Sequence, residues 1–169
     1  MIQKPQNNWW VVQTKSNREF QAVDQLERQG FTTYCPLFKK EIIKGRRVII
    51  KTLPLFPRYI FIQINELIQE RIHVIRSTLG VSQILKIGEN LIIAPHSMID
   101  SIREMEKDRL LNHENHFKPG DVIKIKGGIY NGLEAVYQIT DGLERAVVLI
   151  NLIQQETKLN ISKNQLAKQ

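Results

Sequence analysis

The sequence predicts an α+β protein in two parts: an N-terminal α/β sandwich of about 100 residues and a smaller C-terminal unit. Three observations lead to this fold class. Strand-like and helix-like segments interleave through residues 1–107. Residues 108–118 are polar, have no clean hydrophobic period and are expected to form a linker. Residues 119–169 begin with several turn dipeptides between short alternating segments, a pattern typical of a small β-barrel.

The first elements follow from an aromatic run and a helix-start pattern. Residues 9–13 are aromatic and β-branched and predict a strand. Ser16 and Glu19 have the spacing of a capping box, so a helix is expected over 17–29, with Gly30 as its stop. Its apolar face should carry Phe20, Val23 and Leu26, and its outer face Arg18, Gln21, Gln25 and Arg28.

The middle of the N-terminal unit predicts a basic hairpin between strands. Two β-branched arms flank the turn at 44–47, where Gly45 favours the reversal. The run 55–62 predicts a strand with Tyr59 and Phe61 on one face. Further expected elements are a strand at 31–36, a short helix at 66–71, a strand at 80–87, and a helix from Pro95 to about Glu106 whose apolar face carries Met98, Ile102 and Met105.

The C-terminal segment 143–163 gives conflicting signals. It contains no Gly or Pro, and its apolar residues recur at helical spacing. The run 147–150 is nevertheless rich in β-branched residues, which favour a strand. Such a conflict is often functional, and the alternative is that tertiary contacts override weak propensity. The helical stripe consists of Leu143, Val147, Ile150 and Ile153, and strands are expected upstream at 121–126 and 133–139.

The positive charge is concentrated near the N-terminus. The chain has 169 residues and a net charge of +7. Residues 1–64 contain 11 basic and 4 acidic residues and so carry the whole surplus. A localised basic patch favours a polyanionic partner, most often nucleic acid. The alternative is a solvated hairpin that only keeps the protein soluble.

The sequence contains no motif for catalysis. A glycine-rich phosphate loop and a nucleophile elbow are both absent, so we expect a binding protein rather than an enzyme. Cys35 lies beside Pro36 in an apolar segment and should be packed rather than nucleophilic. His113 and His116 have no third ligand at metal-binding spacing, so neither a metal nor a cofactor is expected.

Composition also favours a cytoplasmic protein without a membrane partner. The longest apolar runs are too short to cross a bilayer, and residues 1–8 have no secretory character. A single cysteine cannot form an internal disulfide, so nothing argues for an oxidising compartment.

Five segments match the pattern of one known family: Trp9–Val12, Gln29–Gly30, Pro54–Phe61, Ile75–Val81 and Lys118–Asp121. Together they resemble the NusG family of transcription elongation factors. Within that family, Ala135 replaces a glycine that is usual in general NusG proteins, and 149–153 with Glu156 and Lys158 resembles the specialised RfaH branch. The resemblance implies an NGN domain over 1–107, a linker over 108–118 and a KOW domain over 119–169.

The resemblance further implies a monomeric antitermination factor that suppresses pausing and binds two partners. Phe56, Tyr59 and Phe61 would contact the clamp helices of the largest subunit of RNA polymerase. Phe56 lies between two prolines, which already makes it a candidate for an exposed protein contact. Basic residues would bind the non-template DNA strand, and the hairpin tip at 44–47 is expected to lie near the basic residues of the first helix. The residues expected to bind nucleic acid are Lys15, Arg18, Arg28, Lys44, Arg46, Arg47 and Arg76.

The RfaH branch also implies fold switching in the KOW domain. A helical hairpin docked on the NGN domain would refold to a barrel that contacts a small-subunit ribosomal protein through Leu133, Tyr137 and Ile153. Leu53 replaces the acid expected to pair with Arg145, so the docked state should be looser or held by other contacts. The expected interdomain residues are Phe56, Ile99, Ile102, Leu149, Leu152 and Ile153.

The sequence is also compatible with other classes of protein. A general NusG-type factor, or another operon-specific paralogue, would keep its KOW domain as a permanent barrel and could recruit the termination factor Rho. An RNA- or ribosome-binding KOW protein would make no polymerase contact.

Overall fold

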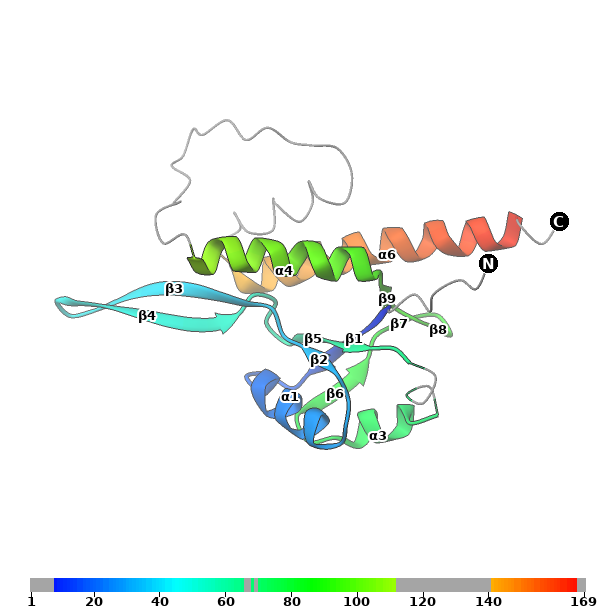
Figure 1. Ribbon diagram of the computed structural model, residues 1–169, viewed down its shortest axis with the longest axis horizontal. Helices are drawn as coiled ribbons and strands as arrows, with labels where there is room; N and C mark the ends of the chain where they lie inside the picture. The colour runs from blue at the N-terminus through cyan, green and yellow to red at the C-terminus, as the bar shows by residue number, and fades with distance from the viewer. Residues whose placement is uncertain (1–7, 66–67, 69, 112–140, 167–169) are drawn as a thin grey trace, which may run out of the picture.

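The computed structural model describes residues 8–65, 68, 70–111 and 141–166, and side chains only as far as 107 in the third range and 154 in the last. Figure 1 shows the arrangement of the elements. In chain order these are β1 (Trp9–Thr14), α1 (Glu19–Arg28), β2 (Thr33–Tyr34), β3 (Leu37–Lys44), β4 (Arg47–Pro54), β5 (Tyr59–Gln63), α3 (Ile72–Ser77), β6 (Val81–Ile84), β7 (Lys86–Ile87), β8 (Asn90–Leu91), β9 (Ile93–Ala94), α4 (His96–Leu111) and α6 (Gly142–Leu166).

An antiparallel sheet in the order β2-β5-β1-β6, with β9 also paired to β1, divides the core into two layers. Side chains alternate along a strand, so Trp9, Val11 and Phe61 face one layer while Trp10 and Val12 face the other. In Figure 1, α1 and α3 lie on one side of the sheet, and α4 and α6 on the other. The predicted α+β fold with an N-terminal sandwich is confirmed.

Helix α1 forms where the sequence predicts it but is oriented differently. Arg18 is its N-cap, and within the described chain that residue makes no side-chain capping bond. Glu19 is buried instead, and its Oε1 accepts a hydrogen bond from the Arg58 backbone N at 2.7 Å. The capping-box prediction is therefore wrong, because the carboxylate is used by a distant backbone amide. Phe20, expected on the apolar face, is 52% exposed, and the face that packs on the sheet is built on Ala22 and Leu26.

A glycine allows the loop before β6 to approach α1 closely. Gly80 has φ +93°, and a Cβ at this position would lie 2.9 Å from the Ala22 backbone nitrogen. We expect Gly80→Ala to cost about 3 kcal/mol of unfolding free energy, from left-handed backbone strain and displacement of α1 together. Gly88 is a matched control, because it has φ +58° and open space around it, so Gly88→Ala should cost only about 1 kcal/mol. Urea denaturation compares them, and equal losses would contradict the close-packing argument.

Several element boundaries differ from those expected. The strand predicted over 55–62 begins only at Tyr59, because Arg58 has φ +70° and the chain bends there. The strand expected at 80–87 is divided between β6 and β7, and helix α3 was not predicted. Helix α4 continues to Leu111, beyond the expected end near Glu106 and into the range expected to be a linker. A short helix is also expected at 66–71, but positions 66, 67 and 69 of that range lie outside the described residues.

The C-terminal segment is helical where the sequence left helix and strand open. Asp141 caps α6, since its Oδ1 accepts from the backbone amides of Leu143 at 2.8 Å and Glu144 at 3.0 Å. The predicted stripe is only partly on the buried face: Ile153 is buried and Ile150 packs against the same cluster, but Leu143 and Val147 are 61% and 59% exposed. The predictions that concern residues 112–140 lie outside the described part of the chain: both upstream strands, Leu133, Ala135, Tyr137 and the His113–His116 pair.

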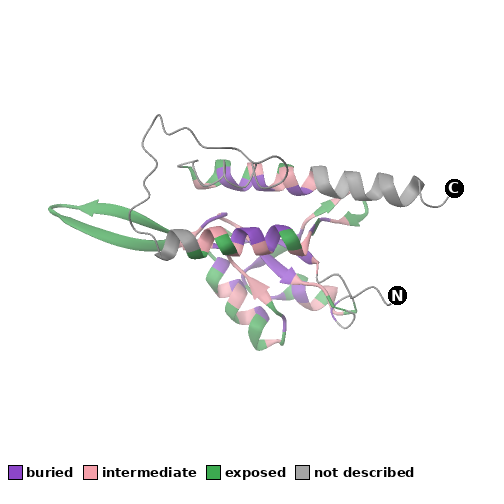
Figure 2. Cartoon of the chain, turned by 45° about the horizontal axis from the view of Figure 1, so that its top comes forward, coloured by how far each residue is buried: buried purple, intermediate pink, exposed green. Residues whose placement is uncertain are grey.

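Strands β3 and β4 form the predicted hairpin, which projects from the rest of the chain. Their register runs from the Leu37–Pro54 pair to the Lys44–Arg47 pair, and the turn begins at Gly45 with φ +64°. Figure 2 shows that the ribbon is exposed along its outer length. Across the described part of the chain, no helix has the length and apolar character needed to span a membrane.

Candidate functional site

The candidate site is an apolar patch of the N-terminal unit that α6 covers. We define this apolar patch by Leu55, Phe56, Phe61, Ile99 and Ile102, each at most 1% exposed. The segment between β4 and β5 supplies Leu55 and Phe56, strand β5 supplies Phe61, and helix α4 supplies Ile99 and Ile102. These side chains form one buried cluster with residues of α6. The residues that α6 contributes are Ala146, Leu149 and Ile153.

The structure brings the six expected interdomain residues together. Phe56, Ile99 and Ile102 are buried in the same cluster as Leu149 and Ile153. Leu152 is partly buried against that cluster. Their assignment to a regulatory interface stays a prediction.

The residues expected to contact polymerase lie in or beside the patch and are covered in this structure. Phe56, expected to be exposed, is 1% exposed because α6 packs over it. Phe61 is buried in the cluster, and Tyr59 is half-buried at its margin. In this structure the Phe56 and Phe61 side chains are therefore not accessible to another protein.

Arg145 ties the first turns of α6 to the N-terminal unit without an acid at position 53. Its side chain is buried, and Nε donates to the Leu55 carbonyl oxygen at 2.8 Å. Its guanidinium carbon lies 4.3 Å from the centroid of the Phe38 ring, a cation–π contact. Burial lowers the pKa of Arg145, and the nearby Asp141 carboxylate opposes that shift. A carbonyl and an aromatic ring thus contact the arginine in a chain where Leu53 replaces the acid usual in the RfaH branch.

Polar contacts fix α4 against the sheet beside the patch. Glu106 accepts from the Tyr34 hydroxyl at 2.6 Å through Oε2 and from the Leu37 backbone N at 3.0 Å through Oε1. The Arg103 guanidinium lies 5.0 Å from the Trp9 ring and 4.9 Å from the Tyr34 ring. Sequence reasoning missed these residues, and no local pattern could reveal them because Glu106 is 69 and 72 positions from its partners.

The basic residues expected to bind nucleic acid are all exposed, but they do not form one surface. Lys15 and Arg18 lie at the start of α1, and its last residue, Arg28, pairs with Asp24 at 3.0 Å. Arg76 lies on α3. The hairpin tip projects away from α1 and α3 in Figures 1 and 2, so the expectation that it lies near them is wrong. The residues at the tip are Lys44, Arg46 and Arg47.

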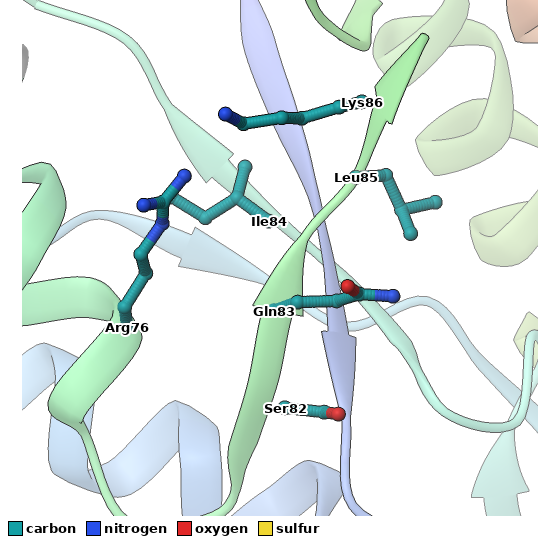
Figure 3. Close-up of a pocket in the computed structure, with 6 residues that line it drawn as sticks. All are labelled: Arg76, Ser82, Gln83, Ile84, Leu85 and Lys86. Carbon is teal, nitrogen blue, oxygen red and sulfur yellow. The ribbon is translucent and has the colours of Figure 1, made fainter. Parts of the chain in front are cut away.

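A hollow of about 320 Å³ extends the basic surface from α3 to the edge strand β6. Arg76 and Lys86 point to the same side of that strand, whereas Gln83 and Leu85 point to the other (Figure 3). Two cations converging in this way can hold an anion such as a phosphate. Sequence reasoning missed Lys86, whose only signal was alternation along the strand. The lining residues are Arg76, Ser82, Gln83, Ile84, Leu85 and Lys86.

Catalytic and metal-binding groups are not assembled in the described residues. Burial, with the Glu19 and Glu106 carboxylates, raises the pKa of Cys35 to about 12. Its side chain is therefore a neutral thiol at physiological pH and a poor nucleophile. In the ranges that the structure describes, no three His, Cys, Asp or Glu side chains are grouped to hold a metal ion.

Comparison with known proteins identifies the family. A solved structure described as "Domain interaction in Thermotoga maritima NusG" is similar at a TM-score of 0.42 and 19% identity, covering 72% of this chain and 66% of that one. The chain thus spans just under two thirds of that protein. The family described as "Transcription termination factor nusG" matches residues 7–103. Because this match spans more than half of the 169 residues, the chain belongs to the NusG family of transcription factors.

Proposed function

We propose that this protein is an RfaH-like transcription elongation and antitermination factor whose C-terminal helix conceals its polymerase-binding patch. The observation that carries the proposal is the burial of Phe56 and Phe61 in one apolar cluster with Leu149 and Ile153 of α6. The surface available for the clamp helices of RNA polymerase would then depend on whether α6 is docked. Family membership supports the polymerase as partner, since NusG factors act on transcription.

The second part of the proposal concerns the released C-terminal domain. Residues 143–163 carry both helical spacing and a β-rich run, so undocking removes the contacts that favour the helix. A sequence with two packings needs them to differ by only a few kcal/mol. On release, residues 119–169 would form a β-barrel and contact a small-subunit ribosomal protein through Leu133, Tyr137 and Ile153.

The nucleic-acid partner in this proposal is the exposed non-template DNA strand. Lys15, Arg18 and Arg76 would contact its backbone, and Arg28 would contribute if it exchanges Asp24 for phosphate. The convergence of Arg76 and Lys86 on one hollow supports this assignment. At the far end of the molecule, Lys44, Arg46 and Arg47 would bind nucleic acid separately.

Circular dichroism tests the switch. A protease site inserted within 112–118 allows the C-terminal segment to be released from the intact chain. We expect the helical signal to fall and the β signal to rise after cleavage and separation, because the free segment loses the apolar cluster that stabilises α6. A general NusG factor with a permanent barrel would give the same β spectrum before and after cleavage, and that result would overturn the proposal.

A further inference from the structure

The hairpin β3–β4 has two chemically different faces. In an antiparallel ribbon, residues directly opposite each other lie on the same side, and the sides alternate along each strand. The register pairs Lys40 with Lys51 and Lys44 with Arg47, and these two pairs share a face. Between them on that face lies the Ile42–Ile49 pair. We call this the cationic face.

The opposite face is apolar and nearly neutral. It carries the Ile43–Val48 pair, which is 78% and 63% exposed, next to Glu41 paired with Ile50. Lys39 also lies on this face. The single acid of the hairpin is therefore turned away from the four cations.

The cations of the cationic face are free to bind an external anion. Lys40, Lys44, Arg47 and Lys51 are all exposed. None of the ion pairs formed among the described residues includes any of them. Because the ribbon projects from the molecule (Figure 2), a large ligand can reach the whole face.

The spacing of the cations matches a wide nucleic-acid groove. The Lys40–Lys51 and Lys44–Arg47 pairs are four residues apart along β3, or about 13 Å at about 3.3 Å per residue. The major groove of B-DNA is about 12 Å wide and admits a two-stranded ribbon, whereas the major groove of an RNA duplex is deep and narrow. Single-strand sites combine a cationic groove with exposed aromatic rings on which the bases stack, whereas the one aromatic on this face, Phe38, is half-buried under Arg145.

We propose that the cationic face binds duplex DNA, with one cation pair on the phosphates of each wall of the major groove and Ile42–Ile49 over the groove. The proposal adds Lys40 and Lys51 to the site and excludes Lys39. This inference rests on the proposed function, which already gives the hairpin a role in binding nucleic acid. It assigns duplex DNA to the hairpin and leaves the single DNA strand to the basic residues of α1 and α3.

The test uses the full chain and fluorescence anisotropy with a labelled DNA duplex of about 20 base pairs, titrated from about 50 to 200 mM salt. Each lost phosphate contact should reduce the slope of log affinity against log salt by about 0.9. We therefore expect Lys40→Gln to lower the slope by about 0.9 and Lys40→Gln/Lys51→Gln by about 1.8, with at least tenfold weaker binding for the double variant. Lys39→Gln removes the same charge one residue away, on the other face, and should leave the slope unchanged.

Competing probes complete the experiment. RNA duplex and single-stranded DNA of the same sequence should bind more weakly than the DNA duplex and depend less on Lys40 and Lys51. Equal slope losses in Lys39→Gln and Lys40→Gln would overturn the proposal, and so would a stronger dependence of the single strand on Lys51. None of these residues lies in the apolar patch, so binding to the polymerase clamp helices, measured on the same variants, reports independently on the proposed function.

Discussion

Leu149→Asp is expected to increase the apparent affinity of the full chain for the polymerase clamp helices by on the order of 100-fold. Leu149 is a residue of α6 that is fully buried in the cluster formed with the apolar patch. Truncating such a leucine costs about 2–5 kcal/mol, and an unpaired carboxylate in its place adds a desolvation cost. The docked state then loses its advantage, so a larger fraction of molecules exposes the patch.

Val147→Asp is the matched control for this experiment. Val147 lies on the same helix, two residues away, and is 59% exposed. The same carboxylate placed there leaves the apolar cluster intact, so the affinity should equal that of the unmodified chain. Isothermal titration with a peptide hairpin of the clamp helices measures both variants. If Leu149→Asp and Val147→Asp bind equally, α6 does not mask the polymerase site.

Phe56→Ala is expected to weaken clamp-helix binding by about 10- to 100-fold when introduced into the Leu149→Asp chain. A large aromatic at the centre of an apolar patch is typical of an interface hot spot, where truncation costs about 2 kcal/mol or more. The Leu149→Asp background is needed because Phe56 also packs against α6. In the unmodified chain the substitution would loosen docking and remove a polymerase contact, and the two effects would partly cancel.

Phe20→Ala provides the same chemical change away from the patch. Phe20 lies on α1, on the other side of the sheet, and is 52% exposed. Its truncation should leave clamp-helix binding unchanged. Circular dichroism and a urea midpoint verify that each variant is folded. Retention of full affinity by a folded Phe56→Ala chain would remove Phe56 from the polymerase-binding surface.

Local sequence patterns predicted the structure correctly where neighbouring residues alone determine it. The aromatic run at β1 and the turn at Gly45 both formed as expected, because strand propensity and turn conformation depend on a few adjacent residues. The basic character of the hairpin follows from composition alone. The family could also be suggested from short motifs, which the match over 7–103 bears out.

Local patterns failed where a distant group takes over a side chain. Glu19 has the spacing of a capping residue but bonds to the Arg58 amide, 39 positions away. Phe56 lies between prolines in a segment expected to be exposed, yet α6 covers it. The absence of an acid at position 53 could be read from the sequence, but not the contacts that Arg145 makes with the Leu55 carbonyl and the Phe38 ring.

The sequence by itself determined the α+β class, the basic hairpin and the double character of residues 143–163. Only the tertiary structure decided that this last segment is a helix, which face it buries and which patch it covers. The physical reason is that helix and strand are nearly balanced in its local propensity, so the burial of Ala146, Leu149 and Ile153 against the apolar patch selects between them. Under the proposed function, the same dependence on a contact that undocking would remove is what would allow the segment to act as a switch.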